Sequence, residues 1–185
     1  MPVTALDPNT ALILIDLQQG IVTLPLAHPA APVIANAAAL ARAFRAAGKP
    51  VVLVNVAAGA PGRTETAPRL PDPLPPGWTD LVPELDPQPT DIRLTKRSWG
   101  AFATTDLGPI LDALGITQVV IAGISTAIGV ESTARQAYEH GFNVTIAVDA
   151  MTDTSAAAHA HSQAHIFPRI GETGTTQEIL ARLKA

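Results

Sequence analysis

The 185-residue sequence contains no cysteine. Disulfide bonds, cysteine-ligated zinc, iron–sulfur clusters and a thiol nucleophile are therefore all excluded. Basic residues are also few, because 12 lysines and arginines stand against 16 acidic residues and give a net charge of −4. No basic patch stands out in the sequence, so neither nucleic acid nor an anionic membrane is an expected partner.

Long apolar runs and a targeting signal are missing as well. The longest aliphatic runs, Ala11–Ile15 and Val119–Ile124, fall far short of the roughly 20 residues that a membrane span needs. The first ten residues, MPVTALDPNT, carry neither a basic n-region nor an apolar h-region, so we expect no secretory signal and a cytoplasmic protein. Only 15% of the residues are charged, which is lean for a soluble monomer and favours a homo-oligomer, a dimer or larger.

What the sequence does contain is an alternation of short aliphatic runs with longer alanine-rich stretches. This order is typical of a parallel sheet that helices cover on both faces. The aliphatic runs predict strands at Ala11–Leu17, Pro50–Ala57, Asp91–Thr95, Thr117–Gly123 and Asn143–Asp149, and a sixth near Pro168–Gly171. Helical spacing predicts helices at Val33–Ala47, Asp106–Leu114, Ile128–Glu139, Ser155–Ile166 and Thr175–Lys184. The predicted fold is α/β, a three-layer α/β/α sandwich around a Rossmann-like parallel sheet of five to six strands.

One segment interrupts this alternation. Nine prolines fall between Pro61 and Pro89, and proline at that density does not fit the interior of a helix or a sheet. We therefore predict one domain over residues 1–185, with a proline-rich surface insert at about 58–90. A lid or a subunit contact is the expected role of the insert, and a tolerated linker is the alternative. Trp78 lies inside it, and an aromatic residue in a loop favours packing on a neighbouring segment.

Polar residues at the predicted strand ends are the first candidates for chemistry, because open α/β sheets bind ligands beyond the carboxyl ends of their strands. Asp16 interrupts the apolar first strand, and Lys96 follows the third. A buried carboxylate costs several kcal/mol unless it is paired or protonated, which makes Lys96 the natural partner of Asp16. The turn Gly123–Gly129 follows the fourth strand, and Asp149 and Asp153 follow the fifth. On spacing alone, a structural Asp–Lys pair and a catalytic one are equally open.

Three segments resemble the isochorismatase-like hydrolase family, also called the cysteine hydrolases. They are ALILIDLQQG at 11–20, TKRSWGAF at 95–102 and GISTAIGVESTARQAYEHGFNVTIAVDAMTD at 123–153. The resemblance implies a three-layer sandwich. It also implies a catalytic set of an aspartate that ends the first strand, a lysine after the third, and a cysteine in the first turn of the helix after the fourth. Asp16 and Lys96 match the first two positions, and Gly129 stands at the third.

Gly129 decides which chemistry the resemblance implies. Without sulfur, the covalent route of thiol-dependent amidases such as nicotinamidase is closed. With glycine at this position, the sequence resembles the isochorismatases proper. These enzymes cleave a vinyl ether with a general acid and need no nucleophile. Asp16 is then the acid, and the apolar first strand favours its neutral form, although Lys96 favours the carboxylate unless its charge is spent on the substrate. The predicted function is a hydrolase that cleaves the enolpyruvyl ether of a small anionic substrate.

Two other functions stay open at this point. One is a hydrolase in which Asp16 is a general base that activates water for attack on another bond. The other is a catalytically silent binding or scaffold protein that kept the fold after losing its cysteine. The presence of both Asp16 and Lys96 argues against the silent protein, because apolar residues easily replace a buried ion pair that has no function.

The resemblance also implies substrate contacts. A cis peptide is expected at Ile124–Ser125, which aims the backbone N–H groups of Ser125 and Gly129 into the pocket as an anion cradle. Close strand–helix packing is the alternative role of the glycines in this turn. Gln18 and Arg97 are further candidate substrate-binding residues, and Arg97 is one of the arginines available to bind substrate carboxylates.

No metal or other cofactor is expected. The nicotinamidases bind a metal through closely spaced histidines after the second strand, and NVAAGAPGRTET at 55–66 holds no histidine. His161 and His165 share a predicted helix face at i, i+4 spacing, with His159 close by. No third ligand is spaced to complete a zinc site, so a solvated helix face or a subunit contact is expected for the three histidines.

Overall fold

The structure is a computed structural model that describes residues 2–66 and 70–183. Its sheet has six parallel strands in the order β3-β2-β1-β4-β5-β6. The strands are β1 (Thr10–Ile15), β2 (Val51–Val56), β3 (Ile92–Lys96), β4 (Gln118–Ile124), β5 (Asn143–Thr152) and β6 (Glu172–Gly174). The chain moves outward from β1 to β3 and then returns to place β4 on the other side of β1. The strand order therefore reverses between β1 and β4, and ligands bind at such a switch point in open sheets.

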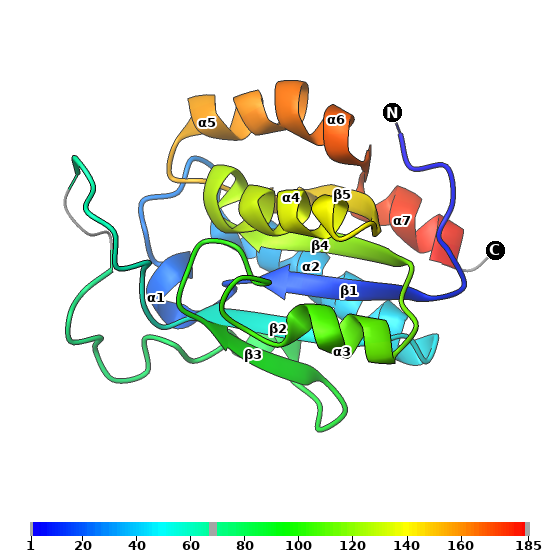
Figure 1. Ribbon diagram of the computed structural model, residues 1–185, viewed down its shortest axis with the longest axis horizontal. Helices are drawn as coiled ribbons and strands as arrows, with labels where there is room; N and C mark the ends of the chain where they lie inside the picture. Colours follow the sequence, from blue (N-terminus) through cyan, green and yellow to red (C-terminus); the bar gives the residue numbers. More distant parts are fainter. Residues whose placement is uncertain (1, 67–69, 184–185) are drawn as a thin grey trace.

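Helices cover both faces of the sheet (Figure 1). On one face lie α2 (Ala30–Ala46) and α7 (Thr176–Leu183), and on the other lie α3 (Leu107–Ala113), α4 (Glu131–Glu139) and α6 (Phe167–Ile170). Successive residues of β1 alternate between the two cores: Leu12 and Leu14 pack on the α2 side, and Ile13 and Ile15 on the α4 side. The predicted three-layer sandwich and parallel sheet are confirmed.

The remaining elements are short. They are α1 (Gln19–Val22), the 3-10 turn η1 (Pro83–Leu85), helix α5 (Ala156–His161), and two π-helical turns, η2 (Thr126–Val130) and η3 (Ser162–Ile166). The turn η2 joins β4 to α4, so the predicted helix after the fourth strand begins with a wide turn. None of the helices in residues 2–66 and 70–183 combines the length and the apolar character that crossing a membrane requires.

Two predicted strands depart clearly from the structure, and the first strand ends at Ile15 and not at the predicted Leu17. The segment near Pro168–Gly171 forms α6, which directly continues the wide turn η3 and has Pro168 as its second residue. Strand β6 begins only at Glu172, which pairs with Thr145. The fifth strand runs beyond the predicted end at Asp149, because its second half pairs with the end of β4. Lys184, the predicted end of the last helix, lies outside the described residues.

The proline-rich insert leaves the sheet after β2 and extends beyond the carboxyl ends of the strands, beside α1 (Figure 1). Backbone hydrogen bonds tie it to the chain that follows Asp16: Gln19 N donates to Asp80 O (2.8 Å) and Gly20 N to Trp78 O (2.9 Å). The Trp78 indole packs so closely on Gly20 that a methyl group there would overlap the ring. Trp78 therefore packs on a neighbouring segment as expected. Residues 67–69 of the predicted insert lie outside the described residues.

Gly123 lets β4 approach β1 closely at the carboxyl edge. Its φ is +127°, a conformation that other residues rarely adopt, and a Cβ there would overlap the carbonyl oxygen of Ile15. The register between β4 and β5 also shifts at this point. This close approach places the turn after β4 beside Asp16, the residue that follows Ile15.

We expect Gly123→Ala to lower the free energy of unfolding by more than about 2 kcal/mol, because the new methyl group meets backbone atoms that have no room to move. Gly59→Ala is the matched control, since a Cβ at Gly59 meets nothing within 4 Å, and its effect should stay within about 0.5 kcal/mol. Urea denaturation followed by circular dichroism measures both values. Equal stability of the two variants would show that the β1–β4 approach does not depend on this glycine.

Candidate active site

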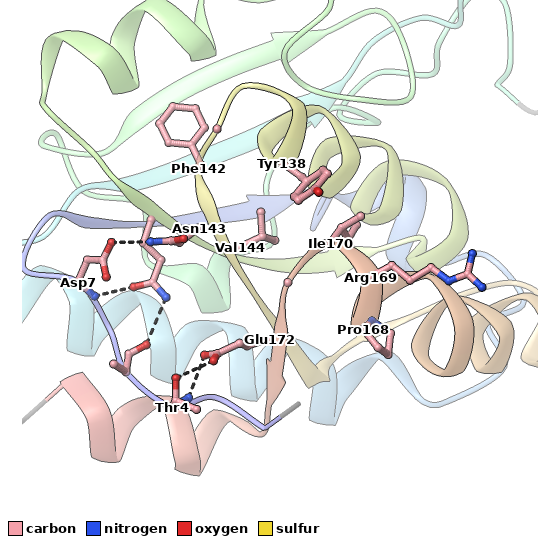
Figure 2. A pocket seen from close by; sticks show the side chains of 14 residues that line it. Thr4, Asp7, Tyr138, Phe142, Asn143, Val144, Pro168, Arg169, Ile170 and Glu172 are labelled. Atoms are coloured by element: carbon pink, nitrogen blue, oxygen red, sulfur yellow. Dashed lines mark hydrogen bonds between the residues drawn. The ribbon is translucent and has the colours of Figure 1, made fainter.

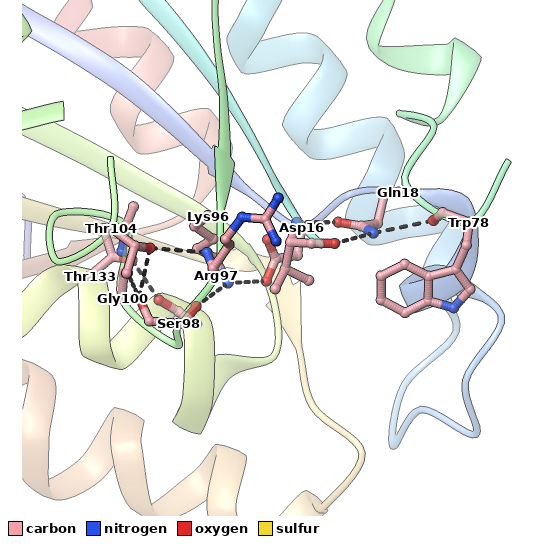
Figure 3. A network of polar contacts seen from close by, with 12 residues as sticks. Asp16, Gln18, Trp78, Lys96, Arg97, Ser98, Gly100, Thr104 and Thr133 are labelled. Atoms are coloured by element: carbon pink, nitrogen blue, oxygen red, sulfur yellow. Dashed lines mark hydrogen bonds and ion pairs between the residues drawn. The ribbon is translucent and has the colours of Figure 1, made fainter. Parts of the chain in front are cut away.

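Asp16 and Lys96 meet at the carboxyl edge of the sheet (Figure 3). Asp16 follows β1 in the left-handed conformation (φ +53°), which ends the strand, and Lys96 is the last residue of β3. Strand β2 lies between these two strands, and the Lys96 side chain bridges to Asp16 with its Nζ 2.7 Å from Asp16 Oδ2. Asp16 and Lys96 are only 5% and 2% exposed. The ion pair that was expected from the sequence is therefore present and buried.

The two oxygens of the Asp16 carboxyl have different surroundings. Oδ2 binds Lys96, whereas Oδ1 is buried with no hydrogen-bond partner among the described residues. Burial raises the pKa of the Asp16 carboxyl to about 6, and the charge and hydrogen bond of Lys96 oppose this rise. A buried oxygen without a partner is costly, so Oδ1 is the natural position for a proton or for a ligand donor.

Gly129 lies directly beside this pair. It belongs to η2, which follows the cis peptide Ile124–Ser125 that the resemblance implied. A Cβ at position 129 would lie 3.2 Å from Asp16 Oδ2 and 2.8 Å from Cγ2 of Ile15. Any side chain here would thus contact the same carboxylate oxygen that binds Lys96. The structure brings Asp16, Lys96 and Gly129 together.

The Gln18 side chain binds backbone groups of neighbouring segments. Its side chain is fully buried, its Nε2 donates to Val56 O (3.1 Å) and Trp78 O (3.2 Å), and its Oε1 accepts from Val56 N (2.7 Å). The amide thereby joins the chain after β1 to the end of β2 and to the insert. With both N–H groups bound to backbone carbonyls, Gln18 stabilises the edge of the site, and the structure gives it this role in place of the predicted substrate contact.

The positions of Arg97 and Ser125 leave their predicted roles open. Arg97 is exposed and directly follows Lys96. Ser125 is half-buried, and its carbonyl accepts hydrogen bonds from Ile128 N and Val130 N. At the start of η2, Ala127 N already donates to the Asp153 carboxylate (2.8 Å). Binding of an anion to the N–H groups of this turn remains a prediction.

His159 does not lie on a solvated helix face. It is 9% exposed and points inward, where its Nδ1 lies 2.7 Å from Thr126 Oγ1 and its Nε2 contacts Gln163. Burial and the neighbouring His28 lower the pKa of His159, against the charge of Asp153. The sequence expectation for this residue is wrong, because its turn of the helix faces η2.

His161 and His165 are exposed as expected, with ring centroids 5.0 Å apart. Within residues 2–66 and 70–183, no three side chains of histidine, cysteine, aspartate or glutamate gather closely enough to hold a metal ion.

A hollow lies at the opposite edge of the sheet (Figure 2). It has a volume of about 500 Å³, and its lining includes Thr4, Asp7, Tyr138 and Arg169. These residues precede β1 or lie near the start of β5 and β6, so the hollow is at the amino ends of the strands. None of the predicted site residues lines it. Ligands of open parallel sheets bind at the carboxyl ends, which makes the Asp16 edge the candidate active site.

Sequence reasoning missed two residues of α4. Thr133 and Gln136 accept hydrogen bonds from the backbone of the loop that follows Lys96. Both residues lie inside the segment 123–153 that carries the resemblance, but the resemblance assigns neither of them a role. The available signal is that Thr133 comes four residues after Gly129, one helical turn later, and this spacing says nothing about a loop elsewhere in the chain.

The sequence model of the isochorismatase domain family matches residues 10–178 of this chain. The chain belongs to the isochorismatase family. It is 46% identical over 183 residues to the isochorismatase family protein YecD of Escherichia coli O157:H7, covering 95% of this chain and 96% of that protein. The solved structure of an isochorismatase family protein from Burkholderia thailandensis is 41% identical, with a TM-score of 0.93 over 98% of both chains.

Isochorismatase family members are hydrolases, and so is this protein. A relative in Pseudomonas putida, maleamate amidohydrolase, is 31% identical over 98 residues, which cover 53% of this chain and 46% of that protein. By its name, that relative hydrolyses an amide. Proteins similar to this chain therefore have names that point to different scissile bonds. The family alone does not identify the bond that this protein cleaves, which depends on the residues of its site.

A single thiol at position 129 tests the geometry without a substrate. We expect the thiol of Gly129→Cys to have a pKa clearly below about 8.5, because the helix start and Lys96 both favour the thiolate. Adding Asp16→Asn should lower this pKa further, because a carboxylate then no longer opposes the thiolate. The rate of alkylation by iodoacetamide across pH measures both values without interference, since the natural chain has no cysteine.

Gly59→Cys provides the matched control for this titration. Gly59 is exposed, and a Cβ there meets nothing within 4 Å, so its thiol should titrate near about 8.5. If the thiol at position 129 titrates like this control with and without Asp16→Asn, then Gly129 does not lie beside the ion pair.

Proposed function

We propose that this protein hydrolyses the enolpyruvyl ether of a small anionic substrate by general-acid catalysis, without a covalent nucleophile. The state of Asp16 carries the proposal: its carboxyl is buried, has a pKa of about 6, and keeps Oδ1 without a partner among the described residues. With this pKa, about one Asp16 in ten is protonated at pH 7. An acid that is partly protonated near neutral pH is suited to donate a proton in each turnover.

The proposed reaction begins when Asp16 transfers its proton to the terminal methylene carbon of the enolpyruvyl group. This carbon becomes a methyl group, and positive charge develops on the neighbouring carbon and its ether oxygen. A water molecule adds to that carbon and gives one proton back to the Asp16 carboxylate. The hemiketal so formed breaks its bond to the ether oxygen and releases pyruvate and an alcohol. One water is consumed, and Asp16 ends in its starting state.

Lys96 and Gly129 support this assignment. Lys96 binds Oδ2 at 2.7 Å, which leaves Oδ1 as the oxygen that faces a ligand, and its charge attracts the carboxylates of an anionic substrate. Gly129 lets the turn η2 lie directly against Asp16, because a Cβ there would come within 3.2 Å of Oδ2 and 2.8 Å of Ile15 Cγ2. The exposed Arg97 is a further cation for a substrate carboxylate. The expected partner is a small molecule, while a homo-oligomer and a cytoplasmic location remain predictions from the sequence.

The same carboxyl supports a second candidate function. A pKa of about 6 makes the carboxylate the majority form at pH 7, and a carboxylate can act as a general base that activates water. Such an enzyme would hydrolyse an amide or another bond. The two candidates require opposite protonation states of Asp16.

The dependence of the rate on pH separates the two candidates. We expect pyruvate release from isochorismate, measured by coupling to lactate dehydrogenase, with a kcat/KM that falls about tenfold per pH unit as the pH rises through and above about 6. General-base catalysis gives the opposite slope, with activity lost below about pH 6. Absence of pyruvate across this range would remove isochorismate as the substrate, and absence of any hydrolysis on ether and amide panels would reject both candidate reactions.

Removal of the proton donor should abolish the reaction. Asp16→Asn is expected to lower kcat/KM by at least about a hundredfold, because the amide has the same shape but cannot supply the proton. Lys96→Ala should raise KM and lower kcat together. Steady-state kinetics measure both variants, and circular dichroism verifies their fold.

Asp91→Asn is the matched control for Asp16→Asn. Asp91 also has a buried carboxylate in an ion pair, with the partly exposed Arg45 at 2.8 Å, but it precedes β3 and so lies at the opposite edge of the sheet. Its substitution should cost stability and leave kcat/KM within about threefold, since it does not touch the site. A loss of less than about tenfold in Asp16→Asn would take Asp16 out of the mechanism. Unchanged kinetics in Lys96→Ala would make the ion pair structural.

A further inference from the structure

The loop that follows β3 folds back on the ion pair (Figure 3). Lys96 Nζ, which binds Asp16, also donates to the carbonyl oxygen of Ser98 (3.1 Å). Within the loop, Ser98 Oγ donates to Gly100 O (2.9 Å), and Thr104 Oγ1 accepts from Arg97 N (2.9 Å). The loop over residues 97–104 is therefore closed on itself, and it fixes one of the N–H groups of the Lys96 ammonium.

Thr133 joins this loop to the turn that carries Gly129. Its hydroxyl accepts a hydrogen bond from Ala101 N (3.1 Å) and donates one to Gly129 O (2.7 Å), and the side chain is fully buried. A threonine in a helix commonly binds the carbonyl four residues back. The bond from Ala101 has no such local origin, because 32 residues separate it from Thr133.

Gln136 makes a parallel contact one helical turn later. Its Oε1 accepts from Phe102 N (3.1 Å), so two successive N–H groups of the loop end on side chains of α4. The loop lies so close to the helix that a Cβ on Gly100 would overlap the Gln136 amide. The position of the loop, and with it the Ser98 carbonyl that binds Lys96, is thus set by α4.

These contacts form a closed ring from Asp16 through Lys96, the loop and Thr133 to Gly129, which again lies beside Asp16. We propose that Thr133, assisted by Gln136, is the positioning residue that holds the Lys96 ammonium on Asp16 and fixes the Gly129 turn beside the pair. Neither residue touches the carboxyl, so both act through the loop and the turn. The catalytic importance of this role rests on the function proposed above, whereas the role itself can be tested without a substrate.

The test is a ¹³C NMR titration of the Asp16 carboxyl carbon, assigned by its disappearance in Asp16→Asn. In Thr133→Val, Ala101 N loses its acceptor and the loop relaxes, so Lys96 retreats from Asp16. Because the ammonium lowers the pKa of the carboxyl, its retreat should raise the titration midpoint by about one unit relative to the natural protein. Thr133→Ser keeps the hydroxyl and should restore the midpoint to within about 0.3 units of the natural protein.

Thr10→Val controls for the loss of a buried threonine hydroxyl. Thr10 is fully buried at the start of β1, and its hydroxyl donates to Asp7 O (2.6 Å) and contacts Gln118 Oε1 (3.0 Å) at the far edge of the sheet. Both valine variants should lower the melting temperature by about 2–4 °C, but Thr10→Val should leave the Asp16 midpoint unchanged. A midpoint in Thr133→Val that equals the one in Thr10→Val overturns the proposal.

Gln136→Met keeps the proposal testable if Thr133→Val does not fold, because Gln136 is half-buried and its loss disturbs the core less. A rise of the Asp16 midpoint in this variant supports the positioning role, and an unchanged midpoint overturns it. The result is independent of the proposed reaction: a raised midpoint without any pyruvate release keeps the positioning role and rejects the ether substrate. Pyruvate release with an unchanged midpoint rejects the positioning role alone.

Discussion

The buried ion pair of Asp16 and Lys96 is the constraint on which the rest of the site depends. Removing a carboxylate and an ammonium from water costs several kcal/mol for each ion, and a single contact at 2.7 Å repays this only in part. The uncompensated part appears as the raised pKa of Asp16, for which burial is the largest cause. The burial that makes the pair expensive therefore also keeps a proton available near neutral pH.

The fold supplies the place for this pair at the point where the strand order reverses. Strand β1 lies between β2 and β4, so the residue after β1 lies at the switch point, where open sheets bind ligands. The left-handed conformation of Asp16 ends the strand there, and Gly123 lets β4 come close enough for the turn at Gly129 to contact the carboxylate. The site is a property of how three loops meet at one edge of the sheet.

The two edges of the sheet treat their buried polar groups differently. At the amino edge, Thr10, Gln118 and Thr145 hydrogen-bond one another and the backbone, as expected of polar groups whose role is structural. At the carboxyl edge, one oxygen of Asp16 is left without a partner in the described part of the chain. The unsatisfied carboxylate oxygen is one reason why we propose the second edge as the reactive one; the amide oxygen Oδ1 of Asn55, near the end of β2, is buried there without a partner among the described residues as well.

The sequence by itself determined the layered α/β fold, because its aliphatic runs and alanine-rich stretches alternate with the periods of strands and helices. It also determined the Asp16–Lys96 pair, since a carboxylate inside ALILIDL needs a cation. Only the tertiary structure decided that Gln18 holds the insert, that His159 faces inward, and that Thr133 links the Lys96 loop to Gly129. These roles rest on hydrogen bonds between segments far apart in the chain. Local sequence patterns carry no information about such partners.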